Sequence, residues 1–178
     1  MTGPDPVCIH ATCLQLESGG STLGVLLRGP SGSGKSTLAL RLLDEPGTGL
    51  SMDAEAAVTA SLVSDDQVCL RPVEGALLAS APAAIAGLLE VRGLGIVEVP
   101  RVTARTRLGL VIDHVEASQL DRLPGPAQTS LCGIGLPLHR LDFSRADAPA
   151  RVRLLARLAW GGIQLAADCL PQDLAARR

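Results

Sequence analysis

The chain has 178 residues, a formal net charge of −2 and only one Phe and one Trp, which suits one domain with its own core and argues against a nucleic-acid-binding protein. No apolar run approaches the ~20 residues of a membrane span, and residues 1–6 lack the basic and apolar regions of a secretory signal. We therefore expect a cytoplasmic protein that binds neither nucleic acid nor membrane.

The first part of the chain predicts a β-hairpin followed by a helix. Residues 7–16 and 22–28 are apolar and β-prone, and Gly19-Gly20 between them is a turn signal. From Ser36 the leucines recur at helical spacing. The helix is expected to end at the Asp-Glu-Pro-Gly sequence of residues 44–47.

The rest of the chain alternates strand and helix patterns. The predicted elements are a strand at 62–70 interrupted by Asp65-Asp66, an Ala/Leu-rich helix at 76–89, strands at 95–99 and 107–113, a break at Pro-Gly-Pro 124–126, and helices at 148–158 and 164–176. This alternation predicts the α/β fold class.

The cysteines show no metal-binding pattern. They include no CxxC pair and no cluster with histidine, so nothing supports a structural zinc site. We expect buried, reduced thiols. The five positions are Cys8, Cys13, Cys69, Cys132 and Cys169.

A glycine-rich loop lies between the predicted strand at 22–28 and the helix that follows. It matches the P-loop, or Walker A, pattern G-x-x-x-x-G-K-[ST] in full. Glycines let successive backbone N–H groups surround an anion, and the helix adds its positive end. We therefore expect bound nucleoside triphosphate, with Lys35 at the β- and γ-phosphates and Ser36 on Mg²⁺. The expected binding residues are Gly29, Pro30, Ser31, Gly32, Ser33, Gly34, Lys35, Ser36 and Thr37.

Phosphoryl transfer also needs a carboxylate to orient Mg²⁺ or to accept a proton. Asp113 ends the apolar strand 107–113, as a generic P-loop protein would have it. Asp65 and Asp66 form a rival pair after a weaker strand, and adjacent residues of an extended strand point to opposite sides. The residues alone leave both choices open, with a slight preference for Asp113.

Residues 89–98, Leu-Glu-Val-Arg-Gly-Leu-Gly-Ile-Val-Glu, resemble the signature of the HPr kinase/phosphorylase family. These bacterial enzymes phosphorylate a serine of the phosphocarrier protein HPr, and their signature is an acidic residue, an aliphatic residue and R-G-L-G-I. The resemblance spans residues 7–140. It implies a P-loop domain with a mixed central sheet and flanking helices, the cofactors ATP and Mg²⁺, and an HPr-type protein as partner and serine substrate.

The resemblance also implies roles for individual residues. The family's opening strand carries a histidine, which matches His10 and implies a place near the phosphates. Its L-V-x-D-D segment matches residues 62–66, and the second acid, here Asp66, is implied as the catalytic base in preference to Asp113. The signature acid Glu90 is implied as a Mg²⁺ ligand together with Ser36.

Two arginines and one further acid complete the candidate site. The family's D-R-hydrophobic step matches residues 121–123 and implies a catalytic role for Arg122. Arg92 is a candidate site residue that either pairs with Glu90 along a strand or lies in a loop over the active site. Asp65 is a candidate as the first acid of the Asp-Asp pair.

The chain departs from the family pattern in three places, of which one is a longer interval between the P-loop and Asp65-Asp66, with extra residues around 45–60. Longer members have a separate N-terminal domain with no counterpart here, so we expect residues 1–178 to form a single kinase catalytic domain. The family's P-x-R-P-G-R-N loop, which is tied to dephosphorylation, is not recognisable at residues 136–140. The resemblance therefore supports kinase activity and puts phosphorylase activity in doubt.

Two alternatives remain open. A small-molecule P-loop kinase would use Asp113, whereas a nucleotide-sensing regulatory module would bind ATP and transfer nothing. The family often forms hexamers, and the resemblance leaves open whether this chain forms a homo-oligomer.

Overall fold

The computed structural model describes residues 5–45, 47 and 57–162. None of the described helices is long and apolar enough to cross a membrane. The elements in chain order are β1 (Val7–His10), β2 (Thr12–Ser18), β3 (Ser21–Arg28), α1 (Lys35–Asp44), β4 (Thr59–Ser64), β5 (Gln67–Val73), β6 (Ala76–Ser80), the 3₁₀ helix η2 (Ala83–Ile85), β7 (Leu88–Val91), β8 (Gly95–Glu98), β9 (Arg105–His114), the 3₁₀ helix η3 (Ala117–Gln119), β10 (Ala127–Leu131), β11 (Ile134–Leu141) and α2 (Ala148–Ala159).

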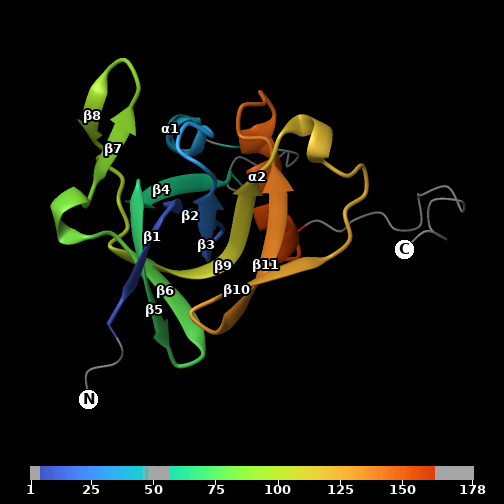
Figure 1. The fold of residues 1–178 in the computed structure, drawn as a ribbon, viewed down its shortest axis with the longest axis horizontal. Helices are drawn as coiled ribbons and strands as arrows, with labels where there is room; N and C mark the ends of the chain where they lie inside the picture. The colour runs from blue at the N-terminus through green and yellow to red at the C-terminus, as the bar shows by residue number, and fades with distance from the viewer. Residues whose placement is uncertain (1–4, 46, 48–56, 163–178) are drawn as a thin grey trace, which may run out of the picture.

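Nine of the described strands form one mixed sheet. Its order is β1-β5-β6-β9-β3-β2-β4, with β11 beside β9 and β10 beside β11. β3 and β11 run parallel to β9, and the other neighbours run antiparallel. The long strand β9 joins the two halves, because its first residues pair with β6 and its later residues pair with β3 and β11 (Figure 1). The separate β7–β8 hairpin projects from this body near α1 (Figure 1).

The sheet is irregular where β3 meets β9. The register between these strands shifts at Gly24 and Val25. A Cβ on Gly24 would lie 2.3 Å from the Arg107 carbonyl oxygen, and a Cβ on Gly109 would lie 2.5 Å from a Leu23 methyl carbon. Since the contact at Gly24 is with backbone, a side chain there would force the two strands apart. The two glycines therefore allow the close approach at which β9 changes from one half of the sheet to the other.

Two hydrophobic clusters lie on opposite faces of the central strands. Val25 and Leu27 of β3 join the first cluster, to which α1 and α2 contribute their buried residues. Leu26, between them, joins the second cluster with residues of β5 and β6. This alternation is that of a strand buried on both faces. The domain thus has three layers, with the helices on one side of the central strands and the β1-β5-β6 layer on the other.

The predicted mixed sheet is confirmed, but the described chain is richer in strands than the expected α/β alternation, since α1 and α2 are its α-helices. Several predicted elements are confirmed. The hairpin is formed by β2 and β3, and the helix after the glycine-rich loop is α1. The strands expected at 95–99 and 107–113 are β8 and β9, and the helix expected at 148–158 is α2. The expected strand at 7–16 divides at Ala11 into β1 and β2, and that at 62–70 falls into β4 and β5 around Asp65-Asp66.

The prediction of a helix at residues 76–89 is wrong. These residues form β6, the short helix η2 and the start of β7. Leu77 and Ala79 are buried in the second cluster while their neighbours are partly exposed, which is the period of a strand and not of a helix. The Ala/Leu composition favours a helix locally, but pairing of β6 with β5 and β9 overrides it. β10 and β11 were not predicted, and the helix expected at 164–176 lies outside the described residues.

The expectation of buried, reduced cysteines is also wrong in part. Cys8 and Cys69 form a disulfide, because the antiparallel register of β1 and β5 places them directly opposite each other. Cys13 is a free, buried thiol as expected, and Cys132 is free but exposed. Burial raises the pKa of the Cys13 thiol far above its usual value, so this thiol is inert. Cys169 lies outside the described residues.

Candidate active site

The glycine-rich loop connects β3 to α1. Gly32 and Gly34 have φ values of 82° and 91°, which side chains rarely adopt. A Cβ on Gly29 would lie 2.8 Å from the Cβ of His114, so that position also requires glycine. Gly34 precedes α1, which has no side-chain cap and no acidic residue in its first turn. The positive end of α1 therefore remains available to an anion, as the P-loop pattern predicts.

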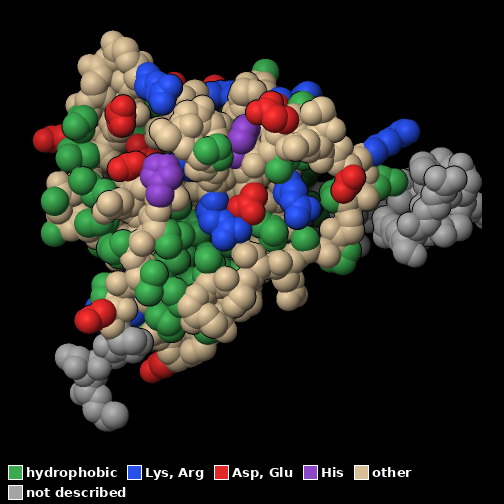
Figure 2. All heavy atoms as spheres, in the orientation of Figure 1, with side chains coloured by type: hydrophobic (Ala, Val, Ile, Leu, Met, Phe, Trp, Pro, Cys, Tyr) green, Lys and Arg blue, Asp and Glu red, His purple; other side chains and the backbone are tan. Residues whose placement is uncertain are grey.

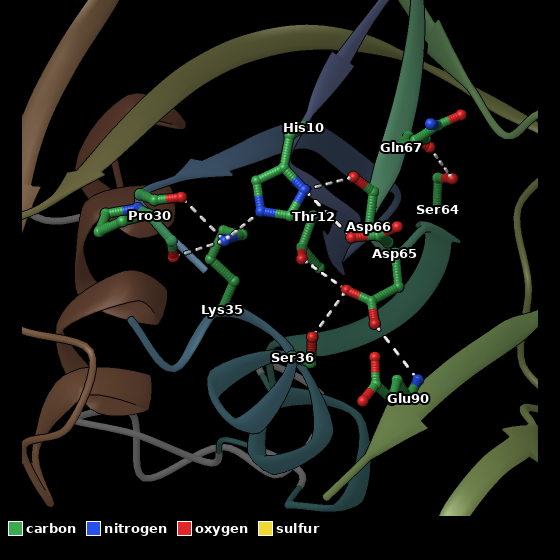
Figure 3. A network of polar contacts seen from close by, with 11 residues as sticks. His10, Thr12, Pro30, Lys35, Ser36, Ser64, Asp65, Asp66, Gln67 and Glu90 are labelled. Atoms are coloured by element: carbon green, nitrogen blue, oxygen red, sulfur yellow. Dashed lines mark hydrogen bonds and ion pairs between the residues drawn. The ribbon is translucent and has the colours of Figure 1, made fainter. Parts of the chain in front are cut away.

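The ammonium group of Lys35 lies inside this loop. Its Nζ donates to the carbonyl oxygens of Gly29 at 2.8 Å and Pro30 at 3.0 Å, and it lies 3.0 Å from Nε2 of His10 (Figure 3). The side chain is buried, and burial lowers the pKa of Lys35 while the charges of Asp65 and Asp66 raise it again in part. The three N–H donors of the ammonium are thus all engaged.

His10 connects Lys35 to Asp66. Its Nδ1 lies 3.0 Å from the carbonyl oxygen and 3.1 Å from Oδ1 of Asp66 (Figure 3). Since an ammonium can only donate, Nε2 accepts from Lys35 and the ring proton lies on Nδ1, from which it is donated to Asp66. The resemblance implies a place for His10 near the phosphates, and the structure places its ring against Lys35 of the loop; a role at the phosphates stays a prediction. Lys35 is thus connected through His10 to Asp66, by a hydrogen bond to its carbonyl oxygen and by a 3.1 Å contact with its exposed carboxylate.

Asp66 occupies a turn and not an extended strand. Its φ of 66° is a left-handed conformation, which aspartate tolerates better than most residues. Its side chain is 68% exposed, so the carboxylate is open to a molecule approaching from solvent. Asp65 and Asp66 point in different directions, as expected, but the cause is this turn between β4 and β5.

Asp65 is buried and receives three hydrogen bonds. Its Oδ1 accepts from Thr12 Oγ1 at 2.6 Å and Ser36 Oγ at 3.0 Å, and its Oδ2 accepts from the Glu90 backbone N at 3.3 Å (Figure 3). The sequence did not single out Thr12 as a partner, because the contact joins two segments 53 residues apart. A carboxylate beside the loop hydroxyl is the arrangement that links a phosphate-bound cation to the protein.

The donor set fits Mg²⁺ held jointly with a nucleotide. Among the described residues no three His, Cys, Asp or Glu side chains gather as a self-sufficient metal site. Mg²⁺, however, is usually held by one or two carboxylates together with substrate phosphates. Ser36 and Asp65 supply a hydroxyl and a carboxylate at 3.0 Å from each other, and the Glu90 carboxylate points toward the same place in Figure 3. In addition, the buried Ser33 hydroxyl has no partner within the described chain, as is common where a ligand completes the bonding.

Asp113 has a different partner. Its two carboxylate oxygens accept from Nε and Nη2 of Arg28 at 2.7 and 2.9 Å. The parallel register of β3 and β9 pairs these two residues directly. A bidentate pair of this kind is strong and geometrically specific. Asp113 is thus engaged by Arg28, whereas Asp65 contacts Ser36 of the glycine-rich loop.

The two candidate arginines differ in position. Arg92 lies in the turn between β7 and β8, and its Nη2 is 3.7 Å from the point that a Cβ on Gly32 would occupy. The side chain therefore lies over the glycine-rich loop, which is the second of the two arrangements expected for it. Arg122 lies in the exposed segment between η3 and β10, and none of the described contacts connects it with the loop. Its catalytic role stays a prediction.

The surface around the site is polar. Figure 2 shows charged and histidine side chains gathered near α1 and over the upper ends of β9 and β11, whereas hydrophobic side chains are more numerous over β5 and β6. His114 lies behind the loop, where its Nδ1 accepts from the Phe143 backbone N at 3.3 Å and its ring packs on Phe143 at a centroid distance of 5.1 Å. His114 is thus a structural residue that supports Gly29.

Comparisons with known proteins identify the domain. Residues 7–141 match the family model described as the HPr serine kinase C-terminal domain. Relatives named HPr kinase/phosphorylase include those of Clostridium tetani, 41% identical over 78 residues (44% of this chain and 21% of the relative), and Clostridium acetobutylicum, 38% identical over 130 residues (68% and 38%). A third, from Bordetella pertussis, is 36% identical over 129 residues (67% and 37%). The chain thus spans 38% or less of the lengths of these relatives.

A solved structure has the same fold. The HPr(Ser) kinase/phosphatase of Coxiella burnetii superimposes with a TM-score of 0.70 and 24% sequence identity, over 88% of this chain and 97% of the other.

Proposed function

The chain belongs to the HPr serine kinase C-terminal domain family, and we propose that it is an ATP- and Mg²⁺-dependent protein kinase that phosphorylates a serine of an HPr-type phosphocarrier. Support comes from the family match over residues 7–141 and from the side chains that surround the glycine-rich loop. Within this proposal, residues 29–37 act as the P-loop that binds the triphosphate of ATP.

The chain supplies positive charge where the transferred phosphoryl group would lie. Lys35 would exchange the carbonyl oxygens of Gly29 and Pro30 for phosphate oxygens. Arg92 lies over Gly32 and would face the same phosphates. Both charges offset the negative charge that develops during transfer. Ser36, Asp65 and Glu90 would hold Mg²⁺, which when bound neutralises the phosphates and orients the terminal one.

Asp66 is proposed as the general base. The acceptor serine oxygen forms a bond to the γ-phosphorus, the bond from that phosphorus to the bridging oxygen of ADP breaks, and the serine proton passes to Asp66. The carboxylate is exposed to an incoming protein, and His10 orients it through Nδ1. A positioned carboxylate of this kind typically contributes about 10²–10⁴-fold to the rate of a proton-coupled transfer.

The chain of contacts from Lys35 through His10 to Asp66 is the observation that carries the proposal. It connects the candidate phosphate-binding lysine to the candidate base, which a module that only senses ATP does not need. The small-molecule kinase alternative is weakened because Asp113 is paired with Arg28.

The test is incubation of the protein with ATP, Mg²⁺ and purified HPr, followed by intact-mass measurement of HPr and mapping of the modified residue. We expect one phosphoryl group on a serine of HPr, and transfer slower by about 10²-fold or more when Asp66→Asn replaces the wild-type protein. ATP binding without modification of HPr would instead support the sensing module. Consumption of ATP with small-molecule acceptors but not with HPr would support the small-molecule kinase.

A further inference from the structure

The disulfide between Cys8 and Cys69 lies next to the candidate active site. It joins the edge strand β1 to β5 at directly opposed positions. Cys8 precedes His10 by two residues on β1, and Cys69 follows Asp66 by three residues along the chain into β5. The bond therefore ties together the two segments that carry His10 and Asp66, whose side chains meet at 3.1 Å.

β1 has few other anchors. Of its four residues, Val7, Cys8 and His10 are exposed and Ile9 is partly buried against the second cluster. Its neighbour in the sheet is β5, and it lies at the end of the strand order. A short edge strand with so little buried apolar surface belongs to the low-stability part of a structure, which opens locally. The disulfide is the strongest single connection that holds this strand in place.

Cys8 and His10 lie on the same face of β1, because residues two apart in a strand share a face. On β5 the same face carries Cys69, which is partly exposed, while Val68 and Leu70 point into the second cluster. The disulfide is therefore on the solvent side of the sheet, and it joins an exposed residue, Cys8, to a partly exposed one, Cys69. Accessible disulfides of this kind exchange more readily than buried ones.

We propose that Cys8 and Cys69 form a reversible redox site that controls how firmly β1 holds His10 against Lys35 and Asp66. The reductant is a dithiol protein or two molecules of a small thiol. A thiolate attacks one sulfur to form a mixed disulfide, and a second thiol releases it. Two electrons and two protons pass to the protein, which gains two thiols, while the reductant becomes a disulfide.

The proposed function makes this chemistry relevant, and this step rests on it. An ATP-dependent kinase works in a compartment where thiols are usually kept reduced, and disulfides formed there are usually transient or redox-sensing. The oxidised form keeps β1 docked and His10 in contact with both partners. The reduced form lets β1 open, so that His10 orients Lys35 and Asp66 less often.

The first measurement needs neither ATP nor HPr. The full-length protein is equilibrated in glutathione buffers from fully reducing to fully oxidising, its thiols are alkylated, and peptide mapping reports which cysteines were free. We expect the alkylated fractions of Cys8 and Cys69 to change together and reversibly with the redox state of the buffer. The alkylated fraction of Cys132 should not follow theirs, because Cys132 is a free thiol. Pairing that never occurs, or a bond that no reductant opens in the folded protein, overturns the proposal.

The second measurement tests the coupling to the site. Hydrogen exchange at the β1 amides is compared for oxidised and reduced wild-type protein and for Cys8→Ser, with Cys132→Ser as the matched control. We expect faster exchange at β1 on reduction, the same fast exchange in Cys8→Ser at every redox state, and wild-type behaviour in Cys132→Ser. Unchanged exchange at β1 on reduction overturns the coupling, whether or not the protein is a kinase.

The third measurement connects the site to the proposed activity. The rate of phosphoryl transfer to HPr should fall on the order of tenfold on reduction. A displacement of a catalytic group by about 1 Å lowers the rate of a reaction by up to about 100-fold. Cys8→Ser should transfer the phosphoryl group to HPr at the rate of the reduced wild-type protein, and this rate should not change when reductant is added. Transfer by the wild type at equal rates in both redox states overturns the regulatory role. Absence of transfer in every sample, with the thiol and exchange results as expected, would count against the proposed function alone.

Discussion

Replacement of Asp66 by Asn is the most direct test of the proposed base. The substitution keeps the size of the side chain, and Asn also tolerates the left-handed conformation that Asp66 adopts at a φ of 66°. The amide oxygen can still accept from Nδ1 of His10, and the contact of that nitrogen with the backbone carbonyl is unchanged. Because the side chain is 68% exposed, we expect the free energy of unfolding to change by less than about 0.5 kcal/mol.

The chemistry should respond far more than the stability. Without a basic oxygen, kcat for transfer to HPr should fall by about 10²-fold or more, whereas the affinity for ATP should persist. Asp113→Asn is the comparison variant. It weakens a partly exposed pair with Arg28 and should cost about 1 kcal/mol of stability or less, with kcat nearly unchanged. The assay is the initial rate of HPr phosphorylation together with nucleotide binding by calorimetry. An active Asp66→Asn beside an inactive Asp113→Asn would refute the assignment of the site.

Three further predictions concern the loop, the reverse reaction and the fold. Lys35→Ala should abolish phosphoryl transfer while ATP affinity falls less, because the backbone N–H groups still bind the phosphates; near-normal turnover would contradict this. The protein should release little unmodified HPr from phosphoserine-HPr when inorganic phosphate is added, since residues 136–140 lack the family's P-G-R pattern; rapid release, measured by intact mass, would contradict it. Gly24→Ala should lower the free energy of unfolding by about 2 kcal/mol or more, because its Cβ would meet the Arg107 carbonyl oxygen; Gly135→Ala, whose Cβ meets nothing within 4 Å, is the control in chemical denaturation.

The parts of the fold that the sequence predicts are those with local causes. The hairpin β2–β3 consists of two adjacent apolar runs joined by a turn at Gly19-Gly20, and both glycines adopt positive φ values. The glycine-rich loop and α1 follow from consecutive residues as well. In each case the elements that interact are neighbours in the chain, so the local sequence pattern is sufficient to predict them.

The parts that the sequence does not predict have distant causes. The residues of β6 have a composition typical of a helix, but they form a strand because they pair with β5 and β9. β11 contains Pro137 and reaches its place by pairing with β9 in parallel. The disulfide joins cysteines 61 residues apart that only the register of β1 and β5 brings together.

The site divides in the same way. The loop residues are recognisable from one short pattern, but the roles of the two acids depend on where β4 ends. An extended Asp65-Asp66 would place one acid on each face of a strand. The turn instead buries Asp65 against Thr12 and Ser36 and exposes Asp66 beside His10. The resemblance to the family was needed to choose this pair over Asp113, and the Arg28–Asp113 pair supplies a physical reason for the choice.

Asp65 offers the last and most discriminating prediction, because a buried carboxylate with three donors can be structural, a metal ligand or both. Asp65→Asn replaces one acceptor oxygen by an NH₂ group that only donates, so it disturbs the contacts from Thr12 and Ser36 or from Glu90. We expect the free energy of unfolding to fall by about 1–3 kcal/mol. If Asp65 also holds Mg²⁺ or orients Ser36 toward it, the Mg²⁺ concentration for half-maximal transfer should rise by about 10- to 100-fold.

The control is Thr106→Val, which removes a buried hydroxyl that donates to Gln15 at 2.9 Å. It should lower stability without any change in the Mg²⁺ requirement, since neither Thr106 nor Gln15 has a described contact with the loop. The measurement is a Mg²⁺ titration of HPr phosphorylation at fixed ATP, at a temperature where both variants are folded. An Asp65→Asn protein that is less stable but has the wild-type Mg²⁺ requirement would show that Asp65 only positions the loop, and Glu90 would then be the carboxylate to test as the metal ligand.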